Sequence, residues 1–295
     1  MGEVHEALAP NGERFALKLF ANAGANAEFL RKRFLAEGRL LARFDHPRLV
    51  GVHELAVETG GGRPYFTMDL VLGPAGEPQT LEDVRKTQTL DEARVAAVYA
   101  DLREGLAYLH AHGIVHRDVK LENVLVDAEG RAVLSDFGIS RIFDTRLKKE
   151  LAVTTTMAGE RAPIMGSFGY LAPELKRGER ATPASDAYAL GVLVFRLLTG
   201  VWYEADSTAW ELLAGFDPVW TKLLTALLND DPSRRLPMPE RVDLGASRRR
   251  RRLIRAGVVG LAVLSALALA LACWRMRPTH YDFDEFFPEE EAERR

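Results

Sequence analysis

One stretch of the chain, from Ile114 to Val126, constrains the fold more than any other. It reads IVHRDVKLENVLV, in which two apolar runs typical of short buried segments enclose a dense group of polar residues. The polar members of this group are His116, Arg117, Asp118, Lys120, Glu122 and Asn123. Because a charged group is costly to bury without a partner, the pattern indicates a functional site; the alternative is a polar turn between two strands.

The composition is that of an ordinary globular protein. The chain has 295 residues, of which 47% are apolar and 27% charged, enough for one large domain or two small ones. Its net charge of −3 gives no reason to expect nucleic-acid binding. The single cysteine, Cys273, excludes an internal disulfide and a cysteine-based zinc site, which suits a reducing compartment. The opening residues lack the apolar core of a secretory signal, so we expect none.

An uncharged apolar run from Ala256 to Trp274 predicts a single membrane span, which we assign to residues 253–274. As a helix this run would reach roughly 28 Å, close to the hydrocarbon thickness of a bilayer. The alternative is a buried core helix, but such helices rarely run this far without a polar face. We therefore expect a protein of the cell membrane that crosses the bilayer once.

The charges beside the run predict its orientation. Five arginines, Arg248–Arg252, and then Arg255 precede it, and only Arg275 and Arg277 follow closely. Because positive residues stay on the cytoplasmic side, we expect the preceding part in the cytoplasm and the acidic tail, 275–295, outside. The arginine run could instead bind nucleic acid or direct nuclear import, but beside a span it favours a topological anchor that attracts anionic lipid. The tail is either a solvated end or a contact for a partner.

The remaining sequence divides into a strand-rich and a helical part. Alternating or β-branched patterns predict strands at 3–8, 14–20, 49–57 and 64–72, with a helix at 26–44. Helical periodicity predicts longer helices at 90–112, 185–200 and 218–230. A hinge near residues 71–78 would separate the two parts.

Three further motifs accompany the opening stretch in a fixed order. Lys18 stands in the strand-like FALKLF, SDFGIS contains Asp136, and GSFGYLAPE ends at Glu174. Together the four motifs resemble the eukaryotic-like protein kinases, including the membrane-anchored serine/threonine kinases of bacteria. The resemblance covers residues 1–240 and implies an α+β, bilobal fold. Its N-lobe would span 1–72 and its C-lobe 78–240, followed by a basic juxtamembrane segment, 241–252.

The resemblance implies ATP as cofactor and a lysine that binds its phosphates. Lys18 would hold the α- and β-phosphates and pair with Glu37 on the helix between the strands. A solvated strand lysine is the alternative, but the apolar neighbours of Lys18 favour a partly buried setting in which an ammonium needs partners.

The other catalytic roles also follow from the resemblance. Asp136 and Asn123 would bind Mg²⁺, with Mn²⁺ as a substitute, and Asp118 would accept the proton of the substrate hydroxyl. Lys120 would neutralise the migrating phosphoryl group, and its presence resembles the serine/threonine branch of the family. A base, a cation and a metal ligand must converge on one phosphoryl group, which explains why one short loop carries all three.

The nucleotide pocket is implied by family register alone, since its apolar residues would pack in any core. Its lining would be Val4, Ala16, Met68 and Leu125, with the backbone of Asp69 and Val71 at the purine edge. Gly2 and Val4 match only the end of the glycine-rich loop, so the N-lobe is expected to lack its first strand. Three explanations of the incomplete glycine-rich loop are open: the true start of the protein lies upstream, the N-lobe is shortened, or the protein is a pseudokinase that only binds its partners. Because every charged catalytic group is present, we favour the first explanation.

Other positions match structural or regulatory members of the family. They are His116, Arg117, Phe137, Gly138, Ser167, Glu174, Asp186 and Arg235. Glu174 is expected to pair with Arg235. Asp186 is expected to hold the backbone of the catalytic loop, the segment that carries Asp118, Lys120 and Asn123. Arg117 is expected to belong to a basic pocket for a phosphorylated loop. Thr154, Thr155 and Thr156 are candidate phosphosites, or members of a plain threonine-rich loop.

The sequence thus predicts a membrane-anchored protein kinase that transfers the γ-phosphoryl group of ATP to Ser or Thr hydroxyls of protein substrates. Phosphorylation of the loop between Asp136 and Glu174 would regulate it, with self-association allowing trans-autophosphorylation. The first alternative is a pseudokinase scaffold that binds nucleotide or partners without transfer. A small-molecule kinase of the same fold is the second.

Overall fold

Alternating side chains build an antiparallel sheet in the first part of the chain. The computed structural model describes residues 2–20, 27–58, 62–136, 168–205 and 207–245. Among these, the sheet contains β1 (Gly2–Leu8), β2 (Arg14–Phe20), β3 (Val52–Val57) and β4 (Pro64–Met68), in the order β1-β2-β4-β3. The four predicted strands are therefore confirmed.

Two of these strands are shorter than the sequence pattern predicts. The apolar run continues to Leu72, but β4 stops at Met68 because the next residue turns its carboxylate back onto Gly51. Likewise β3 begins only at Val52, since the residues before it pair with another part of the chain: the Val50 N–H donates to the Leu134 carbonyl at 3.0 Å.

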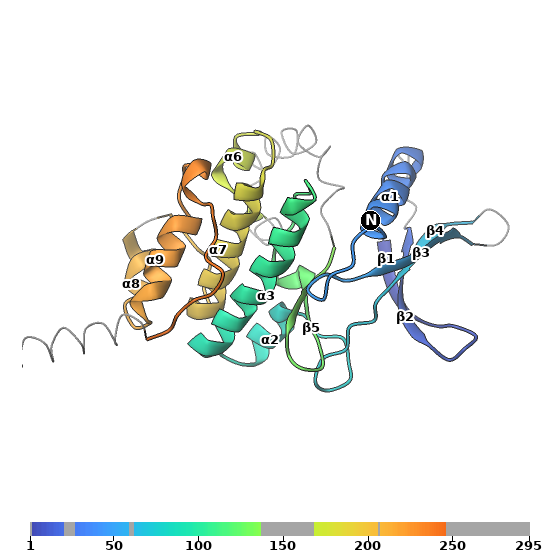
Figure 1. Ribbon diagram of the computed structural model, residues 1–295, viewed down its shortest axis with the longest axis horizontal. Coiled ribbons are helices and arrows are strands. Elements are labelled where there is room, and N and C mark those ends of the chain that lie inside the picture. The colour runs from blue at the N-terminus through green and yellow to red at the C-terminus, as the bar shows by residue number, and fades with distance from the viewer. Residues whose placement is uncertain (1, 21–26, 59–61, 137–167, 206, 246–295) are drawn as a thin grey trace, which may run out of the picture. The chain divides into compact units, whose positions relative to one another are not determined.

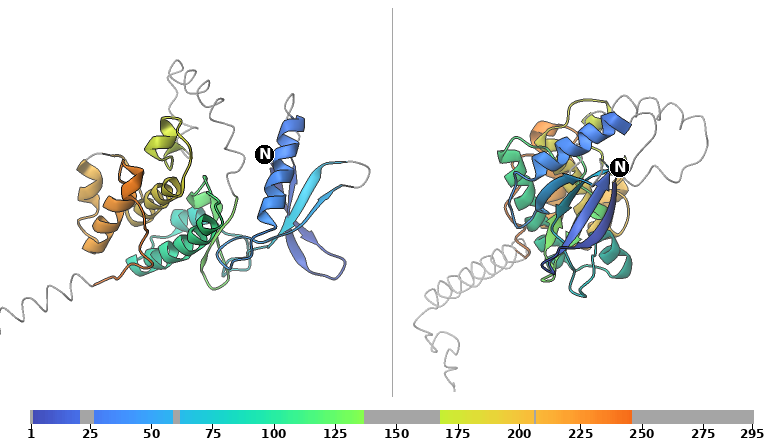
Figure 2. Two further views of the ribbon diagram at one scale, coloured as in Figure 1. Left: turned by 45° about the horizontal axis from the view of Figure 1, so that its top comes forward. Right: turned by 90° about the vertical axis from the view of Figure 1, so that its right-hand side faces the viewer.

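The strand register places the predicted nucleotide-pocket residues on one face of the sheet. Val4 pairs with Lys18 across β1 and β2, and Ala16 pairs with Met68 across β2 and β4. Because paired and alternate residues point to the same side of a sheet, these four share a face. Helix α1 (Ala27–Leu41) packs on the sheet (Figure 2). At this contact the ring centroid of Phe34 lies 4.9 Å from that of Phe66.

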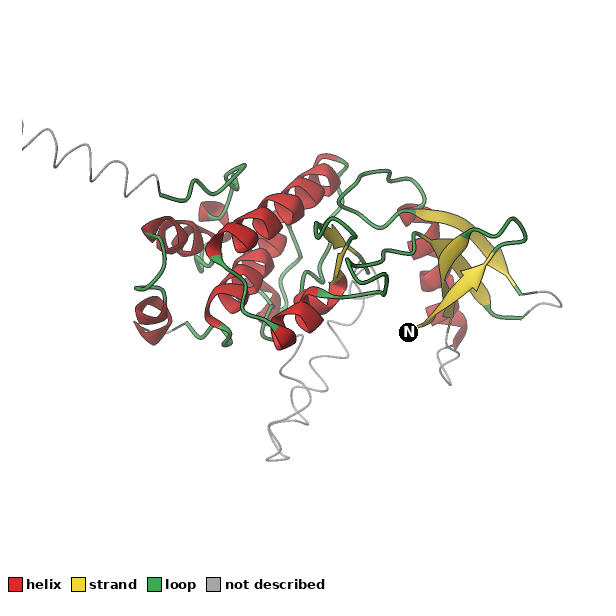
Figure 3. Cartoon of the chain, turned by 90° about the horizontal axis from the view of Figure 1, so that it is seen from below, coloured by secondary structure: helices red, strands yellow, loops and turns green. Residues whose placement is uncertain are grey.

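The second part of the described chain is mainly helical (Figure 3). It contains α2 (Leu81–Thr87), α3 (Glu92–Ala111), α6 (Pro173–Lys176), α7 (Pro183–Thr199), α8 (Ser207–Leu212) and α9 (Pro218–Leu227). The predicted apolar stripe of α3 is buried at Val95, Val98, Leu102, Leu106 and Leu109. Helix α7 packs against α3 and is buried from Ala184 to Leu198, as its almost wholly apolar sequence predicts (Figure 1).

A short hairpin brings two functional segments together. Strand β5 (Val124–Val126) pairs with β6 (Ala132–Leu134), and Val124 lies opposite Leu134. Asn123 immediately precedes β5 and Ser135 follows β6, so both lie at the same end of the hairpin. The short helix η2 (Leu121–Asn123) leads into this end, so the polar stretch and the segment after β6 are neighbours in space.

The described residues up to Leu244 belong to one structural unit. No helix within the described ranges is long and apolar enough to cross a bilayer. The predicted span at 253–274, the arginine run and the acidic tail lie outside the described residues and are not tested by this result.

Candidate active site

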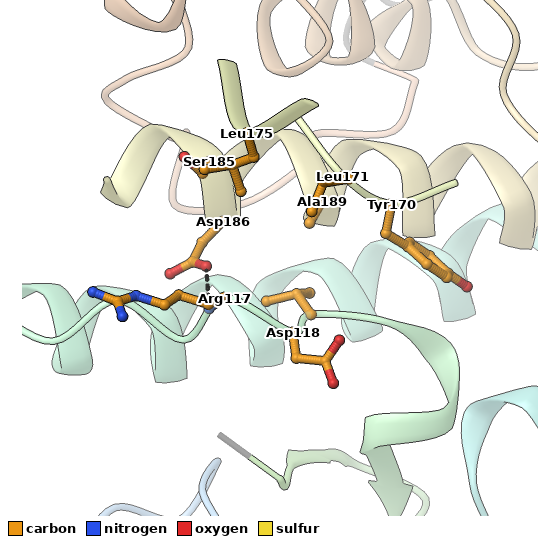
Figure 4. A pocket seen from close by; sticks show the side chains of 9 residues that line it. Arg117, Asp118, Tyr170, Leu171, Leu175, Ser185, Asp186 and Ala189 are labelled. Carbon is orange, nitrogen blue, oxygen red and sulfur yellow. Dashed lines mark hydrogen bonds between the residues drawn. The ribbon is translucent and has the colours of Figure 1, made fainter. Parts of the chain in front are cut away.

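Asp186 holds the backbone of the polar loop from the first turn of α7. Its carboxylate oxygens accept hydrogen bonds from the backbone N–H groups of His116 and Arg117, each at 2.8 Å. His110 Nε2 lies 2.8 Å from the same carboxylate. Arg117 has φ 70°, a left-handed conformation that is unfavourable for a side chain of this size. The two backbone hydrogen bonds to Asp186 help to hold that conformation, and Figure 4 shows the one at Arg117. The predicted contact of Asp186 with the loop backbone is therefore present.

His116 connects this loop to the end of β6. The ring is fully buried, and its Nδ1 accepts from the Asp118 N–H at 3.3 Å while Nε2 lies 3.1 Å from the Ser135 carbonyl oxygen. Burial lowers the pKa of His116, although the carboxylate of Asp186 acts in the opposite direction. A neutral ring protonated on Nε2 satisfies both contacts. His116 therefore fixes Asp118 relative to the residue that precedes Asp136.

Asp118, Lys120 and Asn123 converge within this frame. The Asn123 amide nitrogen donates to the backbone oxygen of Asp118 at 2.9 Å and to its carboxylate at 3.0 Å. The Lys120 ammonium lies 3.2 Å from the same carboxylate. A carboxylate base, a cation and an amide are thus held together by one short loop, 118–123.

Lys18, on β2, contacts Asp136, whose backbone oxygen lies 3.4 Å from the amide nitrogen of Asn123. The Lys18 ammonium lies 2.6 Å from Asp136 Oδ1, and its side chain is only 14% exposed. The partly buried setting predicted for Lys18 is present, and its ammonium is paired. Glu37 lies in α1, but its side chain is outside the described part of the structure, so the predicted Lys18–Glu37 pair stays a prediction.

The predicted pocket face is open at its edge. Ala16 is buried at the middle of the sheet, whereas Val4 on β1 is 54% exposed. Leu125 belongs to β5, in the helical part of the chain, and is half-buried. The assignment of these residues to a nucleotide pocket stays a prediction.

The hydrogen bonds of Asp69 limit which of its backbone groups can bind the edge of a purine base. Its backbone N–H donates to the Gly51 carbonyl at 2.9 Å, and its carboxylate accepts from the Gly51 N–H at 2.7 Å. His53 Nε2 approaches the other carboxylate oxygen at 2.8 Å. The Asp69 N–H is therefore committed inside the protein, which leaves its carbonyl group and the backbone of Val71 for a base.

The oxygen atoms near the hairpin fit a magnesium ion. Asp136 supplies a carboxylate and Asn123 an amide oxygen, which are the hard ligands that Mg²⁺ prefers. Within the described ranges, no cluster of three or more His, Cys, Asp or Glu side chains could hold a metal. Two protein ligands suffice for Mg²⁺ when substrate phosphates complete its shell, as at nucleotide-dependent sites.

A buried ion pair joins α6 to the segment that follows α9. Arg235 donates to both carboxylate oxygens of Glu174, at 2.7 and 2.9 Å, and Ser185 adds a hydrogen bond at 2.9 Å. Burial opposes ionisation of Glu174, but the bonds from Arg235 and Ser185 outweigh it, so its pKa is lowered. The contact predicted between Glu174 and Arg235 is therefore present.

Several predicted residues fall where the structure describes nothing. Phe137, Gly138, Thr154, Thr155, Thr156 and Ser167 lie outside the described residues. Sequence reasoning missed two other contacts. One is between His110 and Asp186. The other is a buried pair in which Arg196 Nη1 donates to the Tyr170 hydroxyl at 2.8 Å. The tyrosine stands inside GSFGYLAPE, and an arginine within the apolar run of α7 was a usable signal.

Comparisons with known proteins agree with this geometry. The family model described as the protein kinase domain matches residues 1–243. The chain belongs to the protein kinase domain family. This kinase domain is 37% identical over 207 residues to the serine/threonine-protein kinase PkaB of Streptomyces coelicolor, covering 68% of this chain and 46% of that protein. It is 35% identical over 205 residues to the serine/threonine-protein kinase PknA of Mycobacterium tuberculosis, covering 68% and 44%.

Solved structures place the kinase domain in the same fold. The crystal structure of a point mutant of the Mycobacterium tuberculosis PknI kinase domain matches with a TM-score of 0.59 and 25% identity, covering 81% of this chain and 87% of that one. The predicted bilobal kinase fold and the predicted family are therefore confirmed. The chain spans less than half the length of the curated relatives named above.

Proposed function

We propose that the kinase domain transfers the γ-phosphoryl group of ATP to Ser or Thr hydroxyls of proteins. The observation that carries this proposal is the convergence of Asp118, Lys120 and Asn123 on one side and Lys18 and Asp136 on the other. Phosphoryl transfer needs positioning and cationic stabilisation more than covalent chemistry, and this set supplies both.

Each side chain has a role that follows from its position. Asp118 accepts the proton of the attacking hydroxyl, and Lys120, 3.2 Å away, neutralises negative charge that develops on the phosphoryl group. Asn123 holds the Asp118 carboxylate by a hydrogen bond at 3.0 Å. Lys18 binds the nucleotide phosphates at the position where it now meets Asp136. Asp136 and Asn123 would hold Mg²⁺, which would supply further positive charge at the phosphates.

The protein substrate class rests on two further points. Lys120 has the spacing from Asp118 that resembles the serine/threonine branch, and PkaB and PknA are both named serine/threonine-protein kinases. A phosphorylated loop acting through Arg117, with Thr154–Thr156 as acceptors, and self-association for trans-autophosphorylation belong to the same proposal.

The test follows phosphate incorporation into the full chain. With Mg-ATP and a protein substrate, intact mass spectrometry is expected to show stepwise addition of phosphate for the wild type and none for Asp118→Asn. The matched control is Asp91→Asn, which keeps a good N-cap on α3 and lies outside the site. Nucleotide binding without transfer by the wild type would favour the pseudokinase alternative, and transfer only to small metabolites would favour the small-molecule kinase.

We also propose a single membrane anchor at residues 253–274, with the kinase domain cytoplasmic and the tail, 275–295, outside. The apolar run and the arginines before it support this proposal. We expect the full chain to stay in the membrane pellet after washing with alkaline carbonate. We also expect a tag placed after Arg295 to be cleaved when protease is added to intact spheroplasts. Release by carbonate, or a protected tag in spheroplasts whose periplasmic markers are cleaved, would contradict it.

A further inference from the structure

The helix η2, which carries the end of the catalytic loop, begins with a buried N–H group that needs a partner. The first N–H groups of a helix have no partner inside it, and Leu121 is fully buried, so water does not satisfy its N–H. Its partner is the Tyr170 hydroxyl, at 3.4 Å. This bond joins the loop between Lys120 and Asn123 to a residue on another segment, and Figure 4 shows Tyr170 pointing toward the chain that follows Asp118.

Burial defines the state of that hydroxyl. Tyr170 is 4% exposed, and burial raises its pKa to about 12, so the hydroxyl stays protonated at neutral pH. Its oxygen accepts two hydrogen bonds, one from Leu121 and one from Arg196 Nη1 at 2.8 Å. The tyrosine oxygen therefore links the catalytic loop to α7.

Arg196 is itself fixed in one orientation. Its guanidinium carbon lies 3.9 Å from the ring centroid of Trp202, and Nη2 lies 3.3 Å from Glu82 Oε1. Glu82 in turn accepts two bonds from Arg85, at 2.8 and 3.0 Å. A planar guanidinium can stack face to face on an aromatic ring while its two Nη groups donate to different partners, whereas the ammonium of a lysine has donors but no planar face to stack.

The residue before Tyr170 is adapted to the same arrangement. A Cβ added at Gly169 would meet the Trp202 ring at 2.5 Å, so a glycine is needed where the tryptophan packs. Tyr170 and Trp202 make an edge-to-face contact with centroids 5.1 Å apart. The tyrosine ring is thus held by its neighbours, and Arg196 directs its hydroxyl.

We propose that Tyr170 and Arg196 are positioning residues that hold the catalytic loop of this kinase domain in place through the Leu121 N–H. This inference rests on the proposed phosphoryl transfer for its effect on turnover, but the contact itself is independent of it. Tyr170 contacts the loop at the Leu121 backbone, and Arg196 contacts Tyr170. Each acts on Lys120 and Asn123 through the backbone that lies between them.

The decisive experiment compares two buried tyrosines in the full chain. Tyr170→Phe removes the acceptor of the Leu121 N–H, whereas Tyr99→Phe removes a hydroxyl that donates to the Pro239 carbonyl oxygen at 2.8 Å, outside the active site. Hydrogen exchange of the Leu121 amide is expected to be about tenfold faster in Tyr170→Phe and unchanged in Tyr99→Phe, since one hydrogen bond contributes about this factor. Equal exchange in the two variants would overturn the proposal.

Turnover supplies the second readout. Tyr170→Phe is expected to lower kcat about tenfold with the KM for ATP unchanged, because the loop and not the nucleotide pocket is displaced. Arg196→Lys, which keeps a donor for the tyrosine, should retain more activity than Arg196→Met. Equal kcat in Tyr170→Phe and Tyr99→Phe would overturn the proposal. If the wild type transfers no phosphate, the proposed function fails, and the Leu121 exchange still decides the positioning contact.

Discussion

Lys18 and Asp136 stand 118 positions apart in the sequence, yet the lysine ammonium lies 2.6 Å from the aspartate carboxylate. The lysine comes from the middle of β2, and the aspartate follows β6. Their contact joins the sheet to the hairpin that carries the catalytic loop. In the proposed function these are the two groups that act at the nucleotide phosphates.

Replacing Lys18 tests this relationship directly. Lys18→Met keeps most of the apolar stem but removes the ammonium, so we expect phosphate transfer to fall about 100-fold or more, as when other preorganised charge-stabilising groups are lost. The matched control is Lys32→Met on α1, where the lysine is 74% exposed and 3.7 Å from Glu28. Radiolabelled phosphate incorporation measures both variants. Equal loss in both, or none in Lys18→Met, would show that Lys18 does not act at the phosphates.

Sequence reasoning reached the elements and the charged residues of the site because both leave strong local patterns. The almost wholly apolar run of α7 predicts burial, and burial is observed from Ala184 to Leu198. The stripe of α3 follows from helical periodicity in the same way. The convergence of Asp118, Asn123 and Asp136 was implied by the resemblance of their motifs to the protein kinases, and the structure brings the three residues together.

The rest depends on contacts that no local pattern encodes. The run ending at Leu72 looks like strand throughout, but the reciprocal bonds between Asp69 and Gly51 end β4 at Met68. Arg196 interrupts an apolar helix, which signals a buried partner without naming it. Its partners, Tyr170, Glu82 and Trp202, come from three other segments and become visible only in the fold.

The Asp69 contacts lead to a prediction about nucleotide affinity. Asp69→Ala removes the acceptor of the Gly51 N–H, so the segment that would bind the purine edge becomes less fixed. We expect ATP affinity to fall about three- to tenfold, the range that one hydrogen bond contributes. Isothermal titration measures the dissociation constant, with the exposed neighbour Asp45→Ala as control. Unchanged ATP affinity in Asp69→Ala would show that these bonds do not order the segment that would bind the purine base.

The Glu174–Arg235 pair makes a prediction about stability. Glu174→Gln leaves the fully buried Arg235 without its counter-charge, so we expect the free energy of unfolding to fall by about 3–5 kcal/mol. The control is Glu179→Gln, which breaks an exposed ion pair with Arg177 and should lower the free energy of unfolding far less, because solvent screens that pair. Urea unfolding followed by circular dichroism measures both. Similar losses in the two variants would contradict a special role for the buried pair.

His116 makes a prediction about pH. Because burial lowers its pKa in the folded protein, the unfolded chain binds a proton to this ring at a higher pH than the folded chain does. The stability that depends on the neutral ring is therefore complete above the unfolded pKa of about 6.5 and decreases as the pH falls below it.

We expect His116→Gln to lose this component, so that its free energy of unfolding falls less steeply than that of the wild type between pH 7 and about 5, by up to about 1.4 kcal/mol per pH unit. Urea unfolding at pH 5, 6 and 7 gives the slopes, with the exposed His112→Gln as the matched variant. The carboxylates of Asp186, Asp118 and Asp136, which favour the charged ring, are present in both variants and do not account for a difference between them. Identical slopes for His116→Gln and His112→Gln would therefore mean that the fold does not hold His116 neutral.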